Sequence, residues 1–252
     1  MKAYVIAIEQ WPVSRKYGQR AVASLRQHGL DAEIFSAVTP DTVEAAETRF
    51  GVRARTRYQT TQMKDPRLTL FKRSCFMSHF SLWNRCFDSG RPIVVAEHDT
   101  VMTRNWDNPE FSGDILNLNV LRTRAGSVPD DHYAPPGIYA HPGDFNRAVI
   151  DRINGRDIEA GRINGAHFYV IKPSGAEKLI RIAREDGFIN TDNMINERYT
   201  DLEYVSPVYG RIQGNLYSSE GWNAGHYFAF TKLMRIRIWK LVRNLPGFGK
   251  AQ

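Results

Sequence analysis

The spacing of apolar residues predicts regular strands and helices in the first 50 residues of the chain. An apolar run at residues 2–8 predicts a buried β-strand, and apolar positions at helical spacing predict a helix over residues 18–28. Residues 31–35 predict a second strand, and helical signals resume near Asp41. This strand–helix–strand–helix order is typical of a sheet that carries helices on its faces.

The strongest helical pattern covers residues 72–88. Residues at helical spacing form one face of this helix: Cys75, His79, Leu82, Trp83 and Cys86. Residues 93–96 then form a short apolar strand, of the kind that is buried on both faces in a parallel sheet. The strand runs directly into Glu97-His98-Asp99, so two acidic residues are expected at its carboxyl end.

The second half of the chain has a less regular pattern. Residues 114–120 and 166–171 predict two further strands, and Pro173 opens a helix. Residues 122–146 contain several prolines and glycines and predict a long irregular loop. Residues 203–228 are rich in aromatic side chains and are expected to be irregular. Together, these segments predict an α/β fold.

Glu97 and Asp99 are the first candidates for chemistry. In open α/β sheets, ligands bind at the carboxyl ends of the strands. Two acids in an acid-X-acid turn can hold a divalent cation by oxygen ligation and leave coordination positions for a diphosphate. The alternative, an ordinary polar end of a strand, is equally compatible with this motif.

Three other positions carry candidate side chains. Ser78-His79 lies on or beside the apolar face of the long helix, where the histidine either borders a ligand pocket or packs in the core. Asp192 follows a short apolar stretch and is either a general base or a helix N-cap. Gly165 permits close backbone approach near His167, which either faces a substrate or begins an ordinary strand.

Taken in order, these segments resemble those of glycosyltransferase family 25, the lipopolysaccharide-biosynthesis type. The resemblance covers roughly residues 3–40 and 70–200, which is most of the chain. It rests on the serial order of several segments: Ala3 to Ile6, Ser74 to Trp83, Pro92 to Asp99, Gly165 to Ile171, Ser174 to Leu179, and Thr191-Asp192.

The resemblance implies a GT-A-like (Rossmann-like) fold with a mixed, mostly parallel sheet flanked by helices. It implies a hexosyltransferase that moves a sugar from a nucleoside-diphosphate donor, a UDP-sugar, to a hydroxyl group of a glycan or lipid-linked glycan. Transfer would invert the anomeric carbon, and a divalent cation, Mn²⁺ or Mg²⁺, is the implied cofactor. The sequence has His98 where the family usually has Asp, so the site loses one negative charge and its metal dependence is open.

The resemblance also suggests roles for individual residues. Asp99 and Glu97 would hold the metal, with His226 completing its shell and His167 as the other candidate. Asp192 would be the general base, with Glu97 as the second choice. The expected donor-binding residues are Ile8, Ser14, Arg15, Ser78, His79, Glu97, His98, Gly165 and His167.

The positive charge of the chain is concentrated at its C-terminal end. The net charge is +7, and no acidic residue follows Glu220. Residues 231–245 predict a basic amphipathic helix, which either contacts an anionic membrane surface or packs on the domain. We therefore expect a glycosyltransferase domain over residues 1–228 and a basic tail over residues 229–252.

Two other functions are compatible with the basic tail. A DNA-modifying glycosyltransferase acting on hydroxylated bases would bind phosphate through the tail. A non-catalytic module that binds nucleic acid or a membrane would use the acid-X-acid turn only structurally. The order of the Ser-His helix, the acidic turn and the late acid favours an enzyme.

Cys75 and Cys86 are expected to be free thiols. On one helix, their spacing separates them by roughly 16 Å, whereas a disulfide needs Cα atoms within about 7 Å. Free thiols fit a reducing cytoplasm. No apolar run approaches the ~18–20 residues of a membrane span, so we expect a cytoplasmic protein that can contact the inner face of the membrane through its tail.

Overall fold

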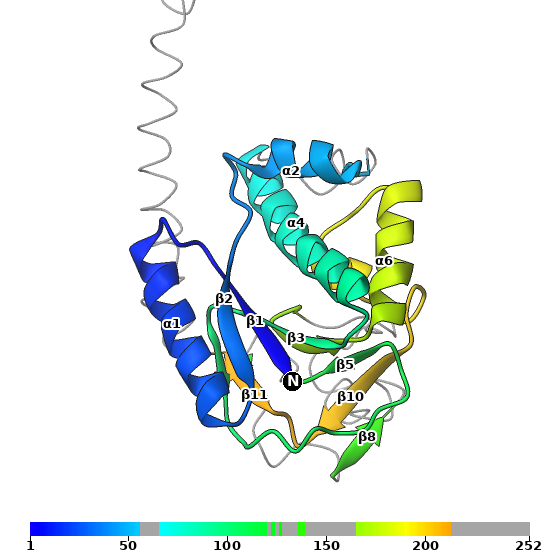
Figure 1. Cartoon of the computed structure of the whole chain (residues 1–252). Coiled ribbons are helices and arrows are strands. Elements are labelled where there is room, and N and C mark those ends of the chain that lie inside the picture. The colour runs from blue at the N-terminus through cyan, green and yellow to red at the C-terminus, as the bar shows by residue number, and fades with distance from the viewer. Residues whose placement is uncertain (56–65, 120–121, 124–125, 128–135, 140–164, 213–252) are drawn as a thin grey trace, which may run out of the picture. The chain divides into compact units, whose positions relative to one another are not determined.

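A seven-stranded sheet lies at the centre of the fold (Figure 1). The structure is a computed structural model that describes residues 1–55, 66–119, 122–123, 126–127, 136–139 and 165–212. The strand order across the sheet is β2-β1-β3-β9-β5-β10-β8. In chain order, the strands are β1 (Lys2–Ala7), β2 (Asp31–Ser36), β3 (Ile93–Glu97), β5 (Ile115–Asn117), β8 (Gly137–Tyr139), β9 (Phe168–Ile171) and β10 (Leu202–Ser206).

Most strands of this sheet run in the same direction. β1 is parallel to β2 and β3, and β5 is parallel to β10. β9 is antiparallel to both of its neighbours, β3 and β5, and therefore gives these two the same direction. β8 is antiparallel to β10 and forms one edge. The predicted mixed, mostly parallel sheet is confirmed.

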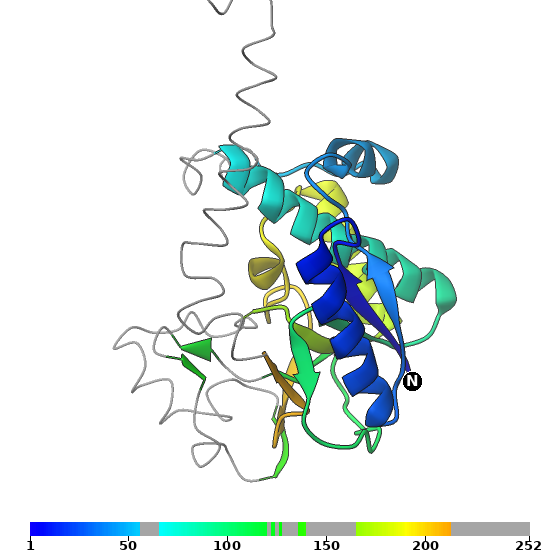
Figure 2. The same cartoon turned by 90° about the vertical axis from the view of Figure 1, so that its left-hand side faces the viewer.

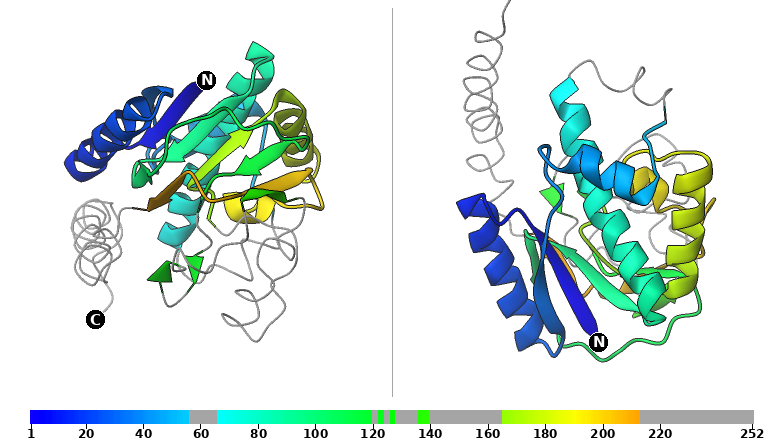
Figure 3. Two further views of the ribbon diagram at one scale, coloured as in Figure 1. Left: turned by 90° about the horizontal axis from the view of Figure 1, so that it is seen from below. Right: turned by 45° about the horizontal axis from the view of Figure 1, so that its top comes forward.

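Helices cover both faces of the sheet (Figures 1 and 2). Each face of the sheet has its own hydrophobic core, and alternate residues of β1 point into one or the other. Ala3 and Val5 pack with α1, and Tyr4 and Ile6 pack with α4. Figure 3 shows α4 and α6 beside each other on one face, and α1 on the other. The helices are α1 (Pro12–Gln27), α2 (Val43–Phe50), α4 (Pro66–Ser89), α6 (Pro173–Glu185) and α7 (Thr191–Met194).

Short strands lie outside the main sheet. β4 (Thr100–Met102) pairs with β11 (Gly210–Ile212), and so joins the segment after β3 to the segment after β10. β6 (Arg122–Thr123) and β7 (Gly126–Ser127) form an antiparallel pair. With β8, these strands replace parts of the irregular loop that was expected over residues 122–146.

Two helices begin earlier than predicted. α1 begins at Pro12 rather than residue 18, and α4 begins at Pro66 rather than residue 72. In both helices proline occupies the first helical position, where its fixed φ and missing N–H are tolerated. Proline is therefore the start signal that the apolar spacing does not contain.

Gly18 explains why the first turns of α1 do not look helical in sequence. Glycine weakens a helix interior, yet Gly18 is buried inside α1. A Cβ atom at this position would lie 2.8 Å from the Cβ atom of Ala7 in β1. Only glycine therefore allows the helix to approach the first strand this closely.

The expectation of an irregular segment over residues 203–228 is wrong at its beginning. β10 is fully buried although it contains Glu203 and Ser206. The Glu203 carboxylate accepts hydrogen bonds from the backbone N–H (3.1 Å) and the hydroxyl (2.5 Å) of Ser112. Paired polar residues can thus occupy a buried strand, and they interrupt the apolar pattern from which strands are predicted.

The remaining early elements agree with the sequence. The strand–helix–strand–helix opening, the long cysteine-containing helix and the strand before Glu97 are confirmed. Cys75 and Cys86 are free thiols. Among the described helices, none is both long and apolar enough to cross a membrane. The predicted domain boundary after residue 228 and the basic tail lie outside the described residues.

Candidate functional site

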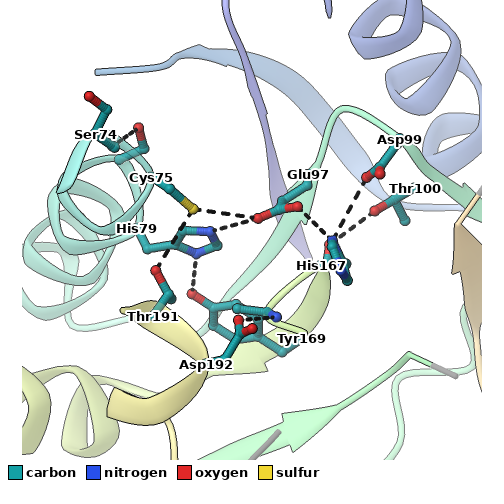
Figure 4. A network of polar contacts seen from close by, with 12 residues as sticks. Ser74, Cys75, His79, Glu97, Asp99, Thr100, His167, Tyr169, Thr191 and Asp192 are labelled. Atoms are coloured by element: carbon teal, nitrogen blue, oxygen red, sulfur yellow. Dashed lines mark hydrogen bonds and ion pairs between the residues drawn. The ribbon is translucent and has the colours of Figure 1, made fainter. Parts of the chain in front are cut away.

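The site lies at the edge of the sheet where β1 and β3 end and β9 begins. Ile6 of β1 is in register with Glu97, the last residue of β3. The backbone N–H of Glu97 donates a hydrogen bond to the carbonyl oxygen of His167 (2.8 Å), just before β9. The antiparallel direction of β9 therefore places His167 beside Glu97, although 70 positions separate them (Figure 4).

Glu97 and His167 form a close ion pair. Nδ1 of His167 lies 2.6 Å from Oε2 of Glu97. Burial alone would raise the pKa of Glu97, but the charge of His167 and hydrogen bonds from His167 and His79 outweigh burial and hold this pKa well below its usual range. Burial alone would lower the pKa of His167, whereas the carboxylate of Glu97, with those of Asp99 and Asp192, raises it to about 9.

Asp99 completes a group of three side chains that can bind a metal. Its Oδ1 atom lies 3.9 Å from Nδ1 of His167. One ligand atom from each of Glu97, Asp99 and His167 lies within 4.8 Å of the other two. Thr100, the first residue of β4, donates its hydroxyl hydrogen to the carbonyl oxygen of His167 (2.9 Å) and holds the two segments together. The acid-X-acid turn and His167 therefore share one site.

Gly165 shapes the position of the His167 ring. Its φ is +96°, in the left-handed region that favours glycine. A Cβ atom at this position would lie 2.6 Å and 2.7 Å from Cδ2 and Nε2 of His167. The missing side chain thus makes space for the imidazole ring.

A chain of buried hydrogen bonds leads from the helix α4 to the other oxygen of Glu97. The indole N–H of Trp83 donates to the hydroxyl oxygen of Tyr169 (2.9 Å), and this oxygen lies 2.9 Å from Nδ1 of His79. Nε2 of His79 lies 3.4 Å from Oε1 of Glu97. Because an indole N–H can only donate, the Tyr169 hydroxyl has its own proton available for Nδ1 of His79. If the Tyr169 hydroxyl donates to Nδ1, the proton of His79 is on Nε2 and is directed at Glu97.

Asp192 approaches this group from α7. Its Oδ1 atom accepts a hydrogen bond from the backbone N–H of Ala166 (3.0 Å), next to His167. Burial is the main cause that raises the pKa of Asp192, and the negative charge of Glu97 adds to it. Asp192 is also close enough to His167 for their charges to interact. The late acid and the acid-X-acid turn are thus brought together (Figure 4).

Cys75 lies one helical turn before His79 and also faces Glu97. Its thiol donates to Oε1 of Glu97 (3.8 Å), and its Sγ atom lies 3.9 Å from Oγ1 of Thr191. The residue keeps solvent-exposed surface. Desolvation of the sulfur, together with the negative charges of Glu97 and Asp192, raises the pKa of this thiol. The thiol is therefore protonated at neutral pH in the absence of a cation.

Asn119 is a further polar residue at the same edge. Asn117 of β5 is in register with Tyr169 of β9, and continuing this antiparallel register by two residues brings Asn119 opposite His167. Asn119 is 3% exposed, and its Nδ2 atom has no hydrogen-bond partner among the described residues. A buried, unpaired amide donor is costly, so the Nδ2 atom of Asn119 is a candidate group for binding a ligand or an ordered water.

Several predicted donor-binding residues contact the protein backbone instead of one another. Ser14 is buried and its hydroxyl accepts from the N–H of Ile8 (2.9 Å), which fixes the turn after β1. The hydroxyl of Ser78 donates to Ser74 and accepts from the N–H of Val38.

The other predicted residues differ in their surroundings. Arg15 is exposed near the start of α1. His98 is half-buried, and its Cβ atom would lie 3.8 Å from a Cβ atom placed on Gly18. His226 lies outside the described residues.

Sequence reasoning missed the partners that hold the site together. Tyr169 and Thr100 carry no signal in the sequence, because each forms its hydrogen bond with a residue far away along the chain, His79 and His167 respectively. Trp83 was assigned only to an apolar helix face, although its indole nitrogen carries a hydrogen bond. Asn119 could have been noticed as a polar residue near the end of the strand predicted over residues 114–120.

The sheet with helices on both faces, the acid-rich strand end and the adjacent histidines define an α/β enzyme with a polar site at the carboxyl ends of its strands. Residues 1–195 match the family described as Glycosyltransferase family 25 (LPS biosynthesis protein). The chain belongs to this family and is a glycosyltransferase. No curated protein was found to match the chain.

Proposed function

We propose that this chain is an inverting glycosyltransferase of the GT-A type that takes a sugar from a nucleoside diphosphate, a UDP-sugar, and transfers it to a hydroxyl group of a glycan or lipid-linked glycan. The observation that carries the proposal is the convergence of Glu97, Asp99, His167 and Asp192 at one strand edge in a member of family 25. Three potential metal ligands and a candidate base thus lie at the same edge of the sheet.

The residues at this edge fit a divalent cation, Mn²⁺ or Mg²⁺. Two carboxylates and an imidazole, from Glu97, Asp99 and His167, present ligand atoms within 4.8 Å of one another. When bound, the cation would act as a Lewis acid that stabilises the negative charge of the departing diphosphate. In the absence of a cation, protonated His167 balances the charge of Glu97 at this position.

Asp192 is proposed as the general base. The reaction needs a group that takes the proton of the acceptor hydroxyl while its oxygen attacks the anomeric carbon. Burial raises the pKa of Asp192 and makes it a stronger base, whereas the pKa of Glu97 is held low by its histidine partners. A base-assisted attack opposite the leaving diphosphate is a single displacement, which inverts the anomeric carbon.

Binding of the donor is assigned to groups around the metal-binding residues. The turn after β1, held by the hydrogen bond between Ile8 and Ser14, lies at the same sheet edge, and Arg15 is exposed next to it. The unpaired amide hydrogens of Asn119 are available to a sugar hydroxyl or a phosphate oxygen. His79 acts on the site through Glu97, because its ring is buried and hydrogen-bonded.

The proposal is tested by incubating the purified chain with a panel of nucleotide sugars, with Mn²⁺ or with a chelator. We expect release of nucleoside diphosphate from one donor in the presence of Mn²⁺. Asp99→Asn should lower kcat/KM by about 100-fold, as for the loss of a group that stabilises the transition state. Asp88→Asn, the same change at an exposed position on α4, should have no effect. Absence of turnover with every donor, or equal turnover in both variants, would overturn the proposal.

The acceptor and the location of the enzyme are proposed from the tail. A basic amphipathic segment at residues 229–252 would hold a cytoplasmic enzyme on an anionic membrane surface, near lipid-linked acceptors. Deletion of these residues should abolish flotation with vesicles that contain anionic lipid and leave donor hydrolysis intact. Activity on DNA with hydroxylated bases, falling steeply as salt rises, would identify the alternative acceptor instead.

A further inference from the structure

Glu97 presents its two carboxylate oxygens to two different groups of side chains. Oε2 lies beside His167 on the side of Asp99, and Oε1 lies beside His79 and Cys75 of α4. The first group belongs to the proposed sugar-transfer site. The second group consists of a thiol, an imidazole and a carboxylate, whose ligand atoms also lie within 4.8 Å of one another.

Two spacings within the second group are close to those of a tetrahedral metal centre. Zinc bonds of about 2.3 Å to sulfur and about 2.0 Å to nitrogen and oxygen separate neighbouring ligand atoms by about 3.3–3.6 Å. Nε2 of His79 lies 3.4 Å from Oε1 of Glu97, and Sγ of Cys75 lies 3.8 Å from the same oxygen. The sulfur is thus only a few tenths of an ångström farther from Oε1 of Glu97 than a shared zinc ion would place it, and Nε2 of His79 lies within 4.8 Å of both atoms.

We propose that Cys75, His79 and Glu97 form a second cation site that is selective for a thiophilic divalent ion such as Zn²⁺. Cys75 and His79 are four positions apart on α4, so both side chains lie on one face of the helix. One thiolate and one carboxylate neutralise the charge of the ion. Cys75 also has the solvent exposure that entry of the ion requires.

The surrounding groups can support this coordination. Binding releases the thiol proton of Cys75 to solvent, because the thiolate is the ligand. Nε2 of His79 must offer its lone pair to the ion, so the ring proton must be on Nδ1. There the N–H donates a hydrogen bond to the Tyr169 oxygen, 2.9 Å away. A fourth position remains for water, on the side where Oγ1 of Thr191 lies 3.9 Å from the sulfur.

Occupation of this site has a consequence for catalysis that rests on the proposed function. Glu97 would become a shared ligand, so an ion at Cys75 and His79 competes for the carboxylate that holds Mn²⁺ or Mg²⁺. The soft sulfur ligand favours Zn²⁺ at this site, whereas oxygen ligands favour the harder ions. Zn²⁺ should therefore inhibit the transferase, and the Cys75→Ser variant should resist this inhibition.

Absorption of bound Co²⁺ tests the site without any donor or acceptor sugar. Wild-type protein titrated with Co²⁺ should develop a thiolate-to-cobalt charge-transfer band, which Zn²⁺ should displace. Cys75→Ser should remove the band and weaken Zn²⁺ binding by at least about tenfold. Cys86→Ser is the matched control on the same helix, because its buried sulfur faces the backbone oxygens of Arg91 and Ile171, and it should retain the band.

Several outcomes would overturn the second site. They are the absence of a charge-transfer band in the wild-type protein, a band that survives in Cys75→Ser, and Zn²⁺ affinities that are equal in the two serine variants. Thermal unfolding of each variant verifies that it is folded. Since the spectrum requires no turnover, it can succeed if the sugar-transfer proposal fails, and turnover with Mn²⁺ can succeed if the spectrum fails.

Discussion

The ring of His167 occupies the space that a side chain on Gly165 would need. Gly165→Ala should therefore have two effects. The φ of +96° should lower the free energy of unfolding by about 1–2 kcal/mol. The new methyl group should also displace the imidazole from Glu97 and lower kcat/KM by at least about tenfold, as expected for misplaced reacting groups. Chemical denaturation and donor turnover measure the two effects separately.

Gly90→Ala is the matched control for this substitution. Gly90 has a φ of +61°, and a Cβ atom there would have no atom of the described residues within 4 Å. We expect a similar loss of stability and unchanged turnover. If both variants lose activity in proportion to their stability, Gly165 has no specific role in positioning His167.

Asp192→Asn should separate the base from the binding groups. Asparagine keeps an oxygen for the N–H of Ala166, so the fold should be retained. Loss of a general base lowers kcat by about 10²–10⁴-fold. Donor binding, followed as the rise in Tm on adding the nucleotide sugar, should change little. An equal loss of donor binding would show that Asp192 is a binding residue instead.

The pH dependence of wild-type turnover should report the protonation of Asp192. A general base acts as the carboxylate, and burial raises the pKa of this group. As the pH is lowered, turnover should therefore begin to fall at a higher pH than it would with an ordinary aspartate, whose pKa is about 3.9. The residual activity of Asp192→Asn should not show this fall at low pH. If the fall persists in the variant, it is caused by another group.

Asn119→Leu should leave stability unchanged or raise it, while it weakens substrate binding. The Nδ2 atom of Asn119 has no protein partner among the described residues, so replacing the amide removes an unsatisfied donor. Loss of a hydrogen bond to the donor or acceptor should raise KM by about tenfold. Asn117→Leu is a useful contrast, because Oδ1 of Asn117 accepts from the N–H of Asn119. That variant should unfold more easily.

Tyr169→Phe should destabilise the fold by about 1–3 kcal/mol, because the buried indole N–H of Trp83 loses its acceptor. Adding Trp83→Phe should cost less than the sum of the two single changes, since the unpaired donor is removed as well. Denaturant unfolding of the two single variants and the double variant measures this coupling. If the losses in the free energy of unfolding of the two single variants simply add up in the double variant, the hydrogen bond between the two side chains does not contribute to stability.

Acid should weaken the attachment of α6 to the sheet through Asp114. This carboxylate accepts from Lys178 and Ser174, both at 2.6 Å, and from the N–H of Asp201 at 3.0 Å. Burial opposes ionisation, but these partners lower the pKa of Asp114 below its usual value. Its contribution to stability is therefore complete above the pKa of the unfolded chain, about 3.9, and is lost as pH falls through the lower pKa of the folded state.

Asp114→Asn tests this contribution. The variant should unfold at a lower temperature than the wild type at pH 7, and the difference should shrink as the pH falls below 4. The exposed variant Asp88→Asn should follow the wild-type curve throughout. A difference in Tm that does not depend on pH would mean that shape, rather than charge, determines the effect of the substitution.

The sequence predicted the elements that carry a strong local signal. The apolar strand that ends at Glu97 and the long helix through His79 have simple periodic patterns, and the structure confirms both. β10 was missed because Glu203 is buried with a partner that lies 91 positions away. Local spacing cannot reveal such a pair, since its stability depends on chain segments brought together by folding.

The candidate site was predicted as separate residues rather than as a network. The acid-X-acid turn follows from its position at a strand end, but the contact of Glu97 with His167 depends on the antiparallel insertion of β9 between β3 and β5. The direction of a strand is not encoded in its apolar pattern. For the same reason, the contact of Tyr169 with His79 could not be predicted from sequence alone.

The close approach of α1 to β1 at Gly18 also fixes the turn that joins them. At this contact only the methyl group of Ala7 lies between helix and strand, so the two elements are closely packed. The residues from Ile8 to Trp11 are consequently held at both ends, by β1 and by α1. One added methyl group at position 18 would push the helix away from the strand and would thereby move the turn that the proposed function assigns to donor binding.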